Sequence, residues 1–467
     1  MNSIIQNRLS AASVLLTAFL LLGCADKSQR NRTFTPVKEE TAEIEFSALK
    51  TAAFDRLSLE QKQLLFYLTQ AAVSGDPIVY QQIHPDGYQI KLMLDGIVSY
   101  TVGMDKTMLN AAEDYAKRFY ANHSFYQTES GLKFIPRDID GPRLKMMTMV
   151  ALSNGARIGF TDHRIIIALF NELDSVIFNP EYEAVISGVR IRLPIPACQP
   201  DSIYAGNDTL APGACSQEAV RIVDYLRAAE PFCPPEQRET LLLLAKYWET
   251  GNDSLYTHYL DENCAGNYPV DCLLGFLPAE IGGEFYEDFL YQAYVYIADS
   301  AHQSLAARAL EEFYASKNPD STAAADMMNY HIDIQAAEIF AAAGFAGYQI
   351  PQAIALSNPA NKTLKIILFT NLIASLQPDN KLDLSESGAF ADIMYQINHQ
   401  ITQGHRFAAA PLKRHAFITP LPKLKTTKMG KVTDVTLEYP ESVRDYSIKL
   451  ADISRVLPQI SQDKLIE

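Results

Sequence analysis

The chain has 467 residues, of which 48% are apolar and 20% are charged, a composition typical of globular proteins with a substantial core. Its formal net charge of −15 disfavours nucleic acid and anionic lipid headgroups as partners, because both repel an acidic surface. Beyond the N-terminus the sequence contains no apolar run of about 18 residues, so it predicts no other membrane span.

The N-terminus has the pattern of an export signal. The apolar stretch 9–22 follows an arginine and is too short for a stable spanning helix. It ends in Leu21-Leu22-Gly23-Cys24, which resembles the lipobox of bacterial lipoproteins. This resemblance implies a signal peptide at 1–23, lipidation of Cys24 and a place in the bacterial cell envelope, at the outer membrane. The alternative is an ordinary signal peptide with an incidental cysteine. The polar residues 24–50 predict a flexible tether.

The remaining five cysteines fit a chain exported to a compartment where disulfides persist. Their spacing is compatible with the pairs Cys198–Cys215 and Cys264–Cys272, which would leave Cys233 free. Spacing alone does not fix this pairing. The sequence lacks a Cys-x-x-Cys pair, so it does not indicate a structural zinc site.

Helical and extended patterns alternate along the chain. The first predicted helix is Leu57–Val73, with a capping box of Ser58 and Gln61 and a closing Gly75. Residues 105–120 also predict a helix. Extended runs follow at 156–195. Further helices are predicted at Ser216–Ala229, Glu236–Glu249, Phe285–Ala298, Ser304–Ala315 and Ala323–Ala343, and further strands at Gln352–Leu356, Leu364–Thr370 and 431–439. This order predicts an α+β fold.

Common catalytic motifs are absent from the sequence. None of the nine histidines is followed by glutamate, so the zinc-peptidase helix with two histidines and an adjacent glutamate does not occur. His399 and His405 lie six residues apart and would face different sides of a helix. We interpret them as surface histidines, in preference to a metal site.

Two charged clusters have open interpretations. The carboxylates Glu280, Glu284, Glu287 and Asp288 could form an acid–base or cation site, or interact with the dipole at a helix start. Residues 393–433 contain no acidic side chain. They carry Arg406, Lys413, Arg414, Lys423, Lys425, Lys428 and Lys431. This basic segment could be a docking face for an anion or acidic partner, or a strip packed beside the acidic remainder.

Six segments resemble, in the correct order, bacterial members of the dipeptidyl peptidase III family. They are FDRLSLEQKQLLFYLTQAAVSG (54–75), LAKYWETGNDSLYTHYL (244–260), VDCLLGF (270–276), GGEFYEDF (282–289), QIPQAIALSNPANK (349–362) and PKLKTTKMGKVTDVTLEYP (422–440). The resemblance spans most of the chain after the tether. It implies the lower lobe of that fold, a β-barrel core with surrounding helices, and a much reduced helical upper part.

The zinc-bearing upper lobe of the family has no counterpart here. Its metal helix reads His-Glu-x-x-Gly-His, and a Glu-Glu-x-Arg motif follows. In this chain about fifty residues join the matching segments where the family has a much longer insertion. The resemblance therefore implies these parts: a lower-lobe α+β body at 51–284, an upper-lobe helical remnant at 285–327, lower-lobe strands at 328–372, a short helical bridge at 373–421 and a C-terminal strand segment at 422–467.

The family's peptide-binding positions are partly retained. Its Glu-x-Tyr falls on Asp271-Cys272-Leu273, so Asp271 would hold the ammonium group of a peptide. Leu273 cannot donate a hydrogen bond to a reacting carbonyl. The family's Asn-x-Pro-Asn strand falls on Ala355–Asn358, which makes Asn358 a second candidate peptide-binding residue. The alternative is that Asp271 and Asn358 are structural, as capping or turn residues.

The resemblance implies a lipid-anchored pseudopeptidase that binds peptides or an envelope protein, without zinc or another cofactor and without catalytic residues. An active dipeptidyl peptidase, with a replacement metal site or a partner supplying the missing lobe, is the first alternative. A purely structural envelope lipoprotein is the second. For a pseudopeptidase we expect weak binding of peptides with free N-termini along an exposed strand edge near Asp271.

Overall fold

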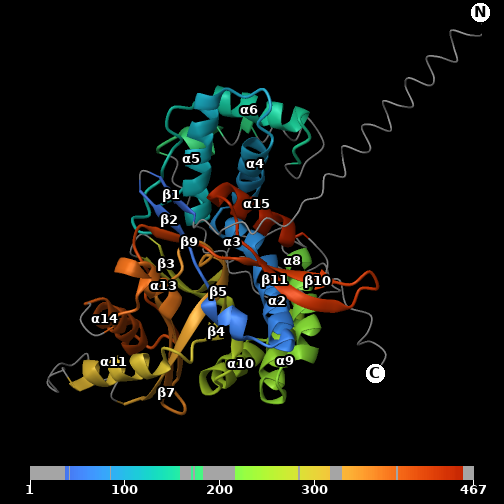
Figure 1. The fold of residues 1–467 in the computed structure, drawn as a ribbon. Helices are drawn as coiled ribbons and strands as arrows, with labels where there is room; N and C mark the ends of the chain where they lie inside the picture. Colours follow the sequence, from blue (N-terminus) through green and yellow to red (C-terminus); the bar gives the residue numbers. More distant parts are fainter. Residues whose placement is uncertain are drawn as a thin grey trace, which may run out of the picture. The chain divides into compact units, whose positions relative to one another are not determined.

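The computed structural model describes residues 37–455 except 42, 85, 158–169, 172–173, 182–215, 282–283, 316–328 and 385–387. Figure 1 shows the arrangement of these elements. The helices are α2 (Leu59–Ser74), α3 (Asp76–Ile83), α4 (Gly87–Ser99), α5 (Lys106–Asn122), α6 (Gly141–Ser153), α8 (Ser216–Ala229), α9 (Pro235–Thr250), α10 (Asp253–Ala265), α11 (Gln303–Ala315), α13 (Thr370–Ser375), α14 (Gly388–Thr402) and α15 (Val443–Ile453), with 3-10 turns η1 (Ala52–Arg56), η2 (Glu230–Phe232) and η3 (Pro378–Asn380). The strands are β1 (Lys38–Glu40), β2 (Glu45–Ala48), β3 (Val270–Ile281), β4 (Glu284–Ala298), β5 (His331–Gly344), β6 (Ala353–Asn358), β7 (Thr363–Phe369), β8 (Phe407–Ala409), β9 (His415–Ile418), β10 (Leu421–Thr426) and β11 (Val432–Glu438).

A six-stranded, nearly closed, barrel-like sheet forms the centre of the fold, in the order β3-β4-β5-β7-β6-β8. All neighbours are antiparallel except β5 and β7. Helix α2 packs against β3, β4 and β5, and α8 packs against α2. In Figure 1, α11 and α14 lie on one side of the sheet and α8, α9 and α10 on the other. The predicted α+β class with a barrel core is therefore confirmed.

Several helix predictions are confirmed. In α2 the Ser58 side chain accepts a hydrogen bond from the backbone N–H of Gln61, and the Gln61 side chain accepts one from the backbone N–H of Ser58. This reciprocal capping fixes the start of the helix, as its sequence indicates. Helices α5, α8, α9 and α11 also lie where helical spacing predicts them. The strands predicted at Gln352–Leu356, Leu364–Thr370 and 431–439 correspond to β6, β7 and β11.

Two helix predictions are wrong. Residues Phe285–Ala298 belong to β4, and the described part of Ala323–Ala343 belongs largely to β5. A central strand that is buried on both faces shows a continuous apolar run, which periodicity does not separate from a buried helix. In β5, Ala336, Ala337 and Ala341–Ala343 are all buried in the sheet. The segment 285–327 is therefore not a helical unit, because β4 is part of the barrel.

The predicted flexible tether is also wrong over its last part. Strand β2 pairs antiparallel with β1 and parallel with β9, so the chain near residue 45 is tied to a segment far along the sequence. Phe46 and Leu49 are fully buried. Val37 and Ile44 of the same polar stretch are buried too, and burial of these few apolar side chains beside a partner strand is something that composition does not reveal. The predicted bridge at 373–421 likewise contains β8 and β9 besides α14.

Some expectations fall outside the described residues. These are the signal peptide, Cys24, the cysteines Cys198 and Cys215, and residues 158–169, 172–173 and 182–195 of the extended runs predicted at 156–195. The described residues 170–171 and 174–178 are helical, so the extended prediction is wrong there. The described residues belong to one compact unit, Val37–Glu467, and the remaining domain boundaries stay predictions. Within the described ranges, no helix combines the length and apolar character that crossing a membrane requires.

Gly344 ends β5 with a φ of +64°, a conformation that side chains with a Cβ rarely adopt. A Cβ there would lie 2.2 Å from the carbonyl oxygen of Tyr291. We expect Gly344→Ala to lower the free energy of unfolding by about 2–4 kcal/mol, from backbone strain plus overpacking. The matched control is Gly404→Ala, since Gly404 has a φ of +91° but no atom near its Cβ position. If urea unfolding showed the same loss of free energy for Gly344→Ala and Gly404→Ala, the contact with Tyr291 would have no effect on stability.

Candidate functional site

The structure places Asp271 inside the protein, where a peptide cannot reach it. The residue lies at the start of β3 and is 2% exposed. Its Oδ1 accepts hydrogen bonds from Gln237 Nε2 at 3.2 Å and from the backbone N–H of Cys272 at 2.8 Å. Its Oδ2 accepts one from the Tyr296 hydroxyl at 3.1 Å. Burial raises the pKa of Asp271, and the nearby positive charge of Lys365 opposes that rise.

Lys365 on β7 is the buried cation opposite this carboxylate. Its Nζ donates to the carbonyl oxygens of Asn263 at 3.1 Å and Gly266 at 2.6 Å, at the C-terminal end of α10. A cation is favourable there because the last carbonyls of a helix carry partial negative charge. Burial lowers the pKa of Lys365, while the charge of Asp271 raises it. Asp271 and Lys365 are thus two buried opposite charges, each held by its own hydrogen bonds to other groups.

The second predicted binding residue, Asn358, also has a structural role. It ends β6 and is buried, and its Oδ1 accepts a hydrogen bond from the backbone N–H of Asn361 at 3.1 Å. This bond shapes the turn between β6 and β7. Within the described residues no hydrogen bond joins Asn358 to Asp271, so the structure does not bring the two predicted residues together in one site.

The edge of β6 on which strand addition would occur is occupied by β8. Residues Leu356, Ala355 and Ile354 pair with Phe407, Ala408 and Ala409. The ladder continues at both ends, where the N–H of Gln352 donates to Ala410 and that of Ser357 donates to Arg406, each at 2.9 Å. The other edge of β6 pairs with β7. A peptide could therefore add to β6 only by displacing β8.

A side chain covers part of the outer edge of β8 as well. The amide of Gln400 on α14 donates to the carbonyl of Ala409 at 2.8 Å and accepts from its N–H at 3.1 Å. These two bonds satisfy both backbone groups of Ala409, as a neighbouring strand would do. Arg406 also forms an ion pair with Asp261 of α10, which ties the residue before β8 to that helix.

The candidate histidines and cysteines do not gather into a reactive centre. His399 is exposed on α14, and His405 lies beyond the end of that helix. Among the described residues no group of three or more His, Cys, Asp or Glu side chains is placed to hold a metal ion. Cys264 and Cys272 are free buried thiols, so the predicted disulfide between them is wrong. Cys264 Sγ instead donates to the carbonyl of Leu356 at 3.4 Å.

The acidic cluster also differs from its predicted setting. Glu280 is exposed on β3, and the other three acids lie on β4, so no helix dipole is present to interact with them. The side chains of Glu284, Glu287 and Asp288 fall outside the described residues.

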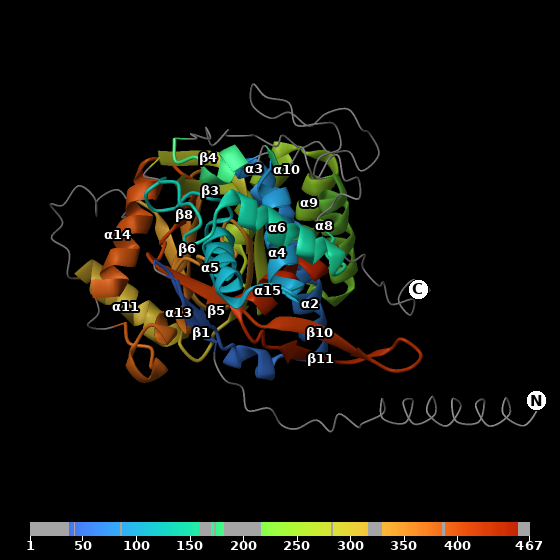
Figure 2. The ribbon, with the colours of Figure 1, turned by 90° about the horizontal axis from the view of Figure 1, so that it is seen from above.

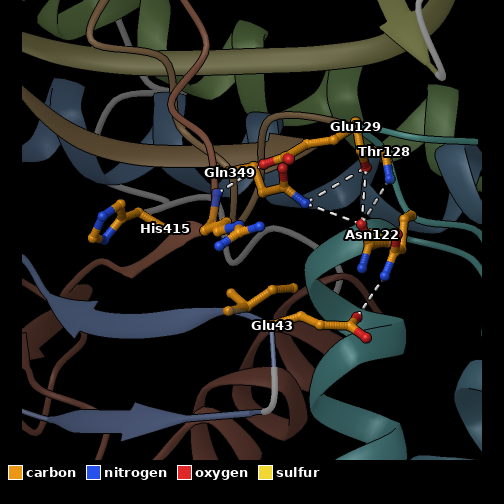
Figure 3. Close-up of a pocket in the computed structure, with 9 residues that line it drawn as sticks. Glu43, Asn122, Thr128, Glu129, Gln349 and His415 are labelled. Carbon is orange, nitrogen blue, oxygen red and sulfur yellow. Dashed lines mark hydrogen bonds between the residues drawn. The ribbon is translucent and has the colours of Figure 1, made fainter.

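A polar pocket of about 220 Å³ lies outside the barrel (Figure 3). Its lining comes from the turn before β2, the end of α5 and the turn that follows it, the segment before β6 and the start of β9. Pockets for drug-sized ligands have about 300–1,000 Å³, so this pocket fits a smaller molecule. The lining residues are Glu43, Ile44, Asn122, Gln127, Thr128, Glu129, Gln349, Arg414 and His415.

Asn122 organises one wall of the pocket. Its Oδ1 accepts hydrogen bonds from the backbone N–H and the hydroxyl of Thr128, at 2.9 and 3.1 Å, and from the amide of Gln349 at 3.2 Å. Across the pocket Glu43 accepts hydrogen bonds from Arg118, Arg137 and Gln127. Figure 3 shows Glu43 facing the Asn122 wall. This wall is held in place by hydrogen bonds before any ligand arrives.

Two opposite charges in the pocket have little compensation from the protein. The guanidinium of Arg414 makes no hydrogen bond or ion pair with the described residues, although its backbone N–H donates to Glu129 Oε1 at 2.9 Å. Glu129 accepts only that one hydrogen bond within the same part of the chain. Arg414 also has a φ of +60°, an uncommon conformation for a residue with a side chain. The pocket therefore offers one free cation and one largely free carboxylate.

Sequence patterns did not identify this pocket. Arg414 belongs to the basic segment 393–433, which was the only signal present. The other lining residues come from short segments that lie far apart along the chain, with no spacing that would connect them.

Comparison with known proteins gives two similar solved structures. A dipeptidyl peptidase III from Caldithrix abyssi shares 16% identity at a TM-score of 0.43, over 70% of this chain and 58% of that one. The enzyme from Corallococcus sp. strain EGB shares 14% identity at a TM-score of 0.41, over 72% and 57%. No family model and no curated protein matches the sequence. The chain thus has partial structural similarity to two dipeptidyl peptidases III and spans less than two thirds of either.

Proposed function

We propose that this chain is a lipid-anchored envelope protein related to dipeptidyl peptidase III, which binds a small zwitterion and does not hydrolyse peptides. The closed edge of β6 is the observation that carries the non-catalytic part. A substrate held by strand addition needs free N–H and C=O groups along an edge, and β8 uses those of β6. Asp271, buried and bonded to three donors, is not available to an ammonium group.

The pocket supports the binding part of the proposal. A guanidinium recognises a carboxylate through charge-assisted hydrogen bonds, and a carboxylate recognises an ammonium group in the same way. Arg414 and Glu129 offer both in one small cavity. A molecule with a free amino and a free carboxyl group, such as a dipeptide, matches this pair of charges. Because both side chains are exposed, we expect weak binding, on the order of 0.1–1 mM.

Ligand-observed NMR with L-alanyl-L-alanine and the protein from residue 25 tests this binding. We expect N-acetylation of the dipeptide, Arg414→Gln or Glu129→Gln each to weaken binding several-fold. Two variants serve as controls: Lys413→Gln removes a neighbouring exposed charge that does not line the pocket, and Asp271→Asn changes the buried site. Neither control should alter binding. If Asp271→Asn abolished binding and Arg414→Gln did not, the dipeptide would bind in the barrel at Asp271 and not in the pocket.

Hydrolysis is tested separately with arginyl-arginyl naphthylamide. We expect no turnover above the buffer rate, with or without added zinc. Turnover that disappears on mutating His399 or His405 would instead support the active peptidase with a replacement metal site. No binding of the dipeptide and no turnover would together support the structural lipoprotein.

A further inference from the structure

The hairpin formed by β10 and β11 extends away from the rest of the fold. Figure 2 shows its tip beyond α2. Leu421 and Val435 are buried at its base, where the strands pack against α2. Lys62 of α2 approaches Asp434 at 4.0 Å. Every residue from Lys425 to Lys431 is exposed. The hairpin is therefore anchored at one end and presents its turn to the surroundings.

The tip combines an apolar side chain with unpaired positive charges. Met429 is 93% exposed, more than any other large apolar residue among those described. The ammonium groups of Lys425, Lys428 and Lys431 make no hydrogen bond or ion pair with the described residues. By contrast, Lys423 nearer the base pairs with Glu438. The charges at the tip are thus left for an external partner.

The turn itself is well defined. The N–H of Thr427 donates to the carbonyl of Lys431 at 2.9 Å, and the N–H of Gly430 donates to that of Thr427 at 3.0 Å. Gly430 has a φ of +84°, which glycine adopts without strain. Met429 is therefore held at the apex between lysines.

We propose that residues 425–431 bind the anionic headgroups of a lipid bilayer, with Met429 inserted at the boundary between headgroups and acyl chains. This contact presupposes the envelope location proposed for the chain. Lysines beside an anionic surface are attracted to it, and an apolar apex gains from leaving water. An acidic protein would account for the lysines and leave Met429 unexplained. Lysines that only protect strand edges would not require an apolar apex either.

The net charge of the chain does not oppose this contact as strongly as composition suggests. At physiological ionic strength charges are screened beyond about 8 Å. Most of the acidic side chains that give the total of −15 lie elsewhere on the molecule, and Asp434, opposite Lys425 in the hairpin, is the acidic residue next to the tip. Net charge alone disfavoured anionic lipid as a partner. For the hairpin tip, where the nearby charges are mainly positive, we expect attraction to anionic lipid instead.

Vesicle sedimentation with the soluble protein from residue 25, which lacks the predicted anchor, is the experiment. We expect binding to phosphatidylcholine vesicles that contain phosphatidylglycerol, little binding to phosphatidylcholine alone, and loss of binding at high salt. Lys428→Gln or Lys431→Gln should weaken binding roughly fivefold each. Lys106→Gln, which removes an exposed charge at the start of α5, should not change it.

A fluorescence experiment tests the insertion. The single tryptophan, Trp248, is buried, so Met429→Trp adds the one exposed indole. Its emission should shift to shorter wavelength when anionic vesicles are added. No binding, or binding that Lys428→Gln and Lys106→Gln weaken equally, would overturn the proposal. Binding without an emission shift would overturn the insertion of Met429. The dipeptide experiment uses no lipid and the vesicle experiment uses no dipeptide. Failure of dipeptide binding can therefore be told apart from failure of lipid binding.

Discussion

Replacing Lys365 with methionine should lower the free energy of unfolding by roughly 3–5 kcal/mol, the largest loss we expect from a single substitution in the barrel. Lys365 is buried, and its positive charge opposes the rise in pKa that burial causes at Asp271. Methionine keeps the length of the side chain but removes the charge and the two hydrogen bonds to Asn263 and Gly266. The Asp271 carboxylate would then remain buried without a compensating cation.

Urea unfolding followed by the fluorescence of Trp248 measures this loss. The double variant Asp271→Asn with Lys365→Met should recover much of it, because no buried charge is left without a partner. Lys413→Met is the matched control for an exposed lysine and should change stability little. A Lys365→Met variant within about 1 kcal/mol of the parent would mean that Asp271 does not depend on this cation.

The pH dependence of stability provides an independent check on Asp271. Burial raises its pKa in the folded state, so the folded protein binds this proton more tightly than the unfolded chain does. The contribution of the Asp271 carboxyl to the free energy of unfolding is fully present below the ordinary aspartate pKa of about 3.9. This contribution is lost as pH rises through the raised pKa of Asp271 in the folded state. The stability of the parent relative to Asp271→Asn should therefore fall as pH increases across that window.

Replacing Cys24 with alanine should move the protein from the membrane fraction to the soluble periplasmic fraction when fractionation is done at high salt, which removes the proposed lipid contact of residues 425–431. Stable anchoring takes more than one acyl chain, and a bacterial lipoprotein cysteine with its three chains meets that requirement. Alanine cannot be acylated, so the anchor would be lost. Cys233→Ala is the matched control, since Cys233 is a free buried thiol, and it should leave fractionation unchanged. Unchanged fractionation of Cys24→Ala would show that the lipobox interpretation is wrong.

The accuracy of the sequence-based expectations depended on how local each feature is. The capping box at Ser58 and Gln61 and the apolar spacing of α2 are determined within one helical turn, and both predictions are confirmed. In β4 and β5 the same reasoning was wrong. Both strands are buried on two faces, and the partners that make them strands lie in other parts of the chain. Local periodicity contains no information about those partners.

In the candidate site, too, local sequence features were predicted and long-range packing was not. The resemblance in sequence pointed to Asp271 and Asn358 because they fall on two motif positions of the family, but burial decides what a carboxylate can bind. The tertiary structure buries Asp271 against Tyr296, under the influence of the Lys365 charge, and assigns Asn358 to a turn. The pairing of β6 with β8 joins segments about fifty residues apart, and it follows from the path of α14 and not from any motif.

The sequence by itself determined the α+β class, the capped helices, the resemblance to dipeptidyl peptidase III, and the absence of a His-Glu motif from the chain. These properties depend on residue identity and near-neighbour spacing, which a sequence contains in full. Only the tertiary structure decided that β8 closes the edge of β6, that Asp271 is inaccessible, and that Glu129 and Arg414 meet in one pocket. Those properties depend on which distant segments pack together, and packing is set by the free energy of the whole fold.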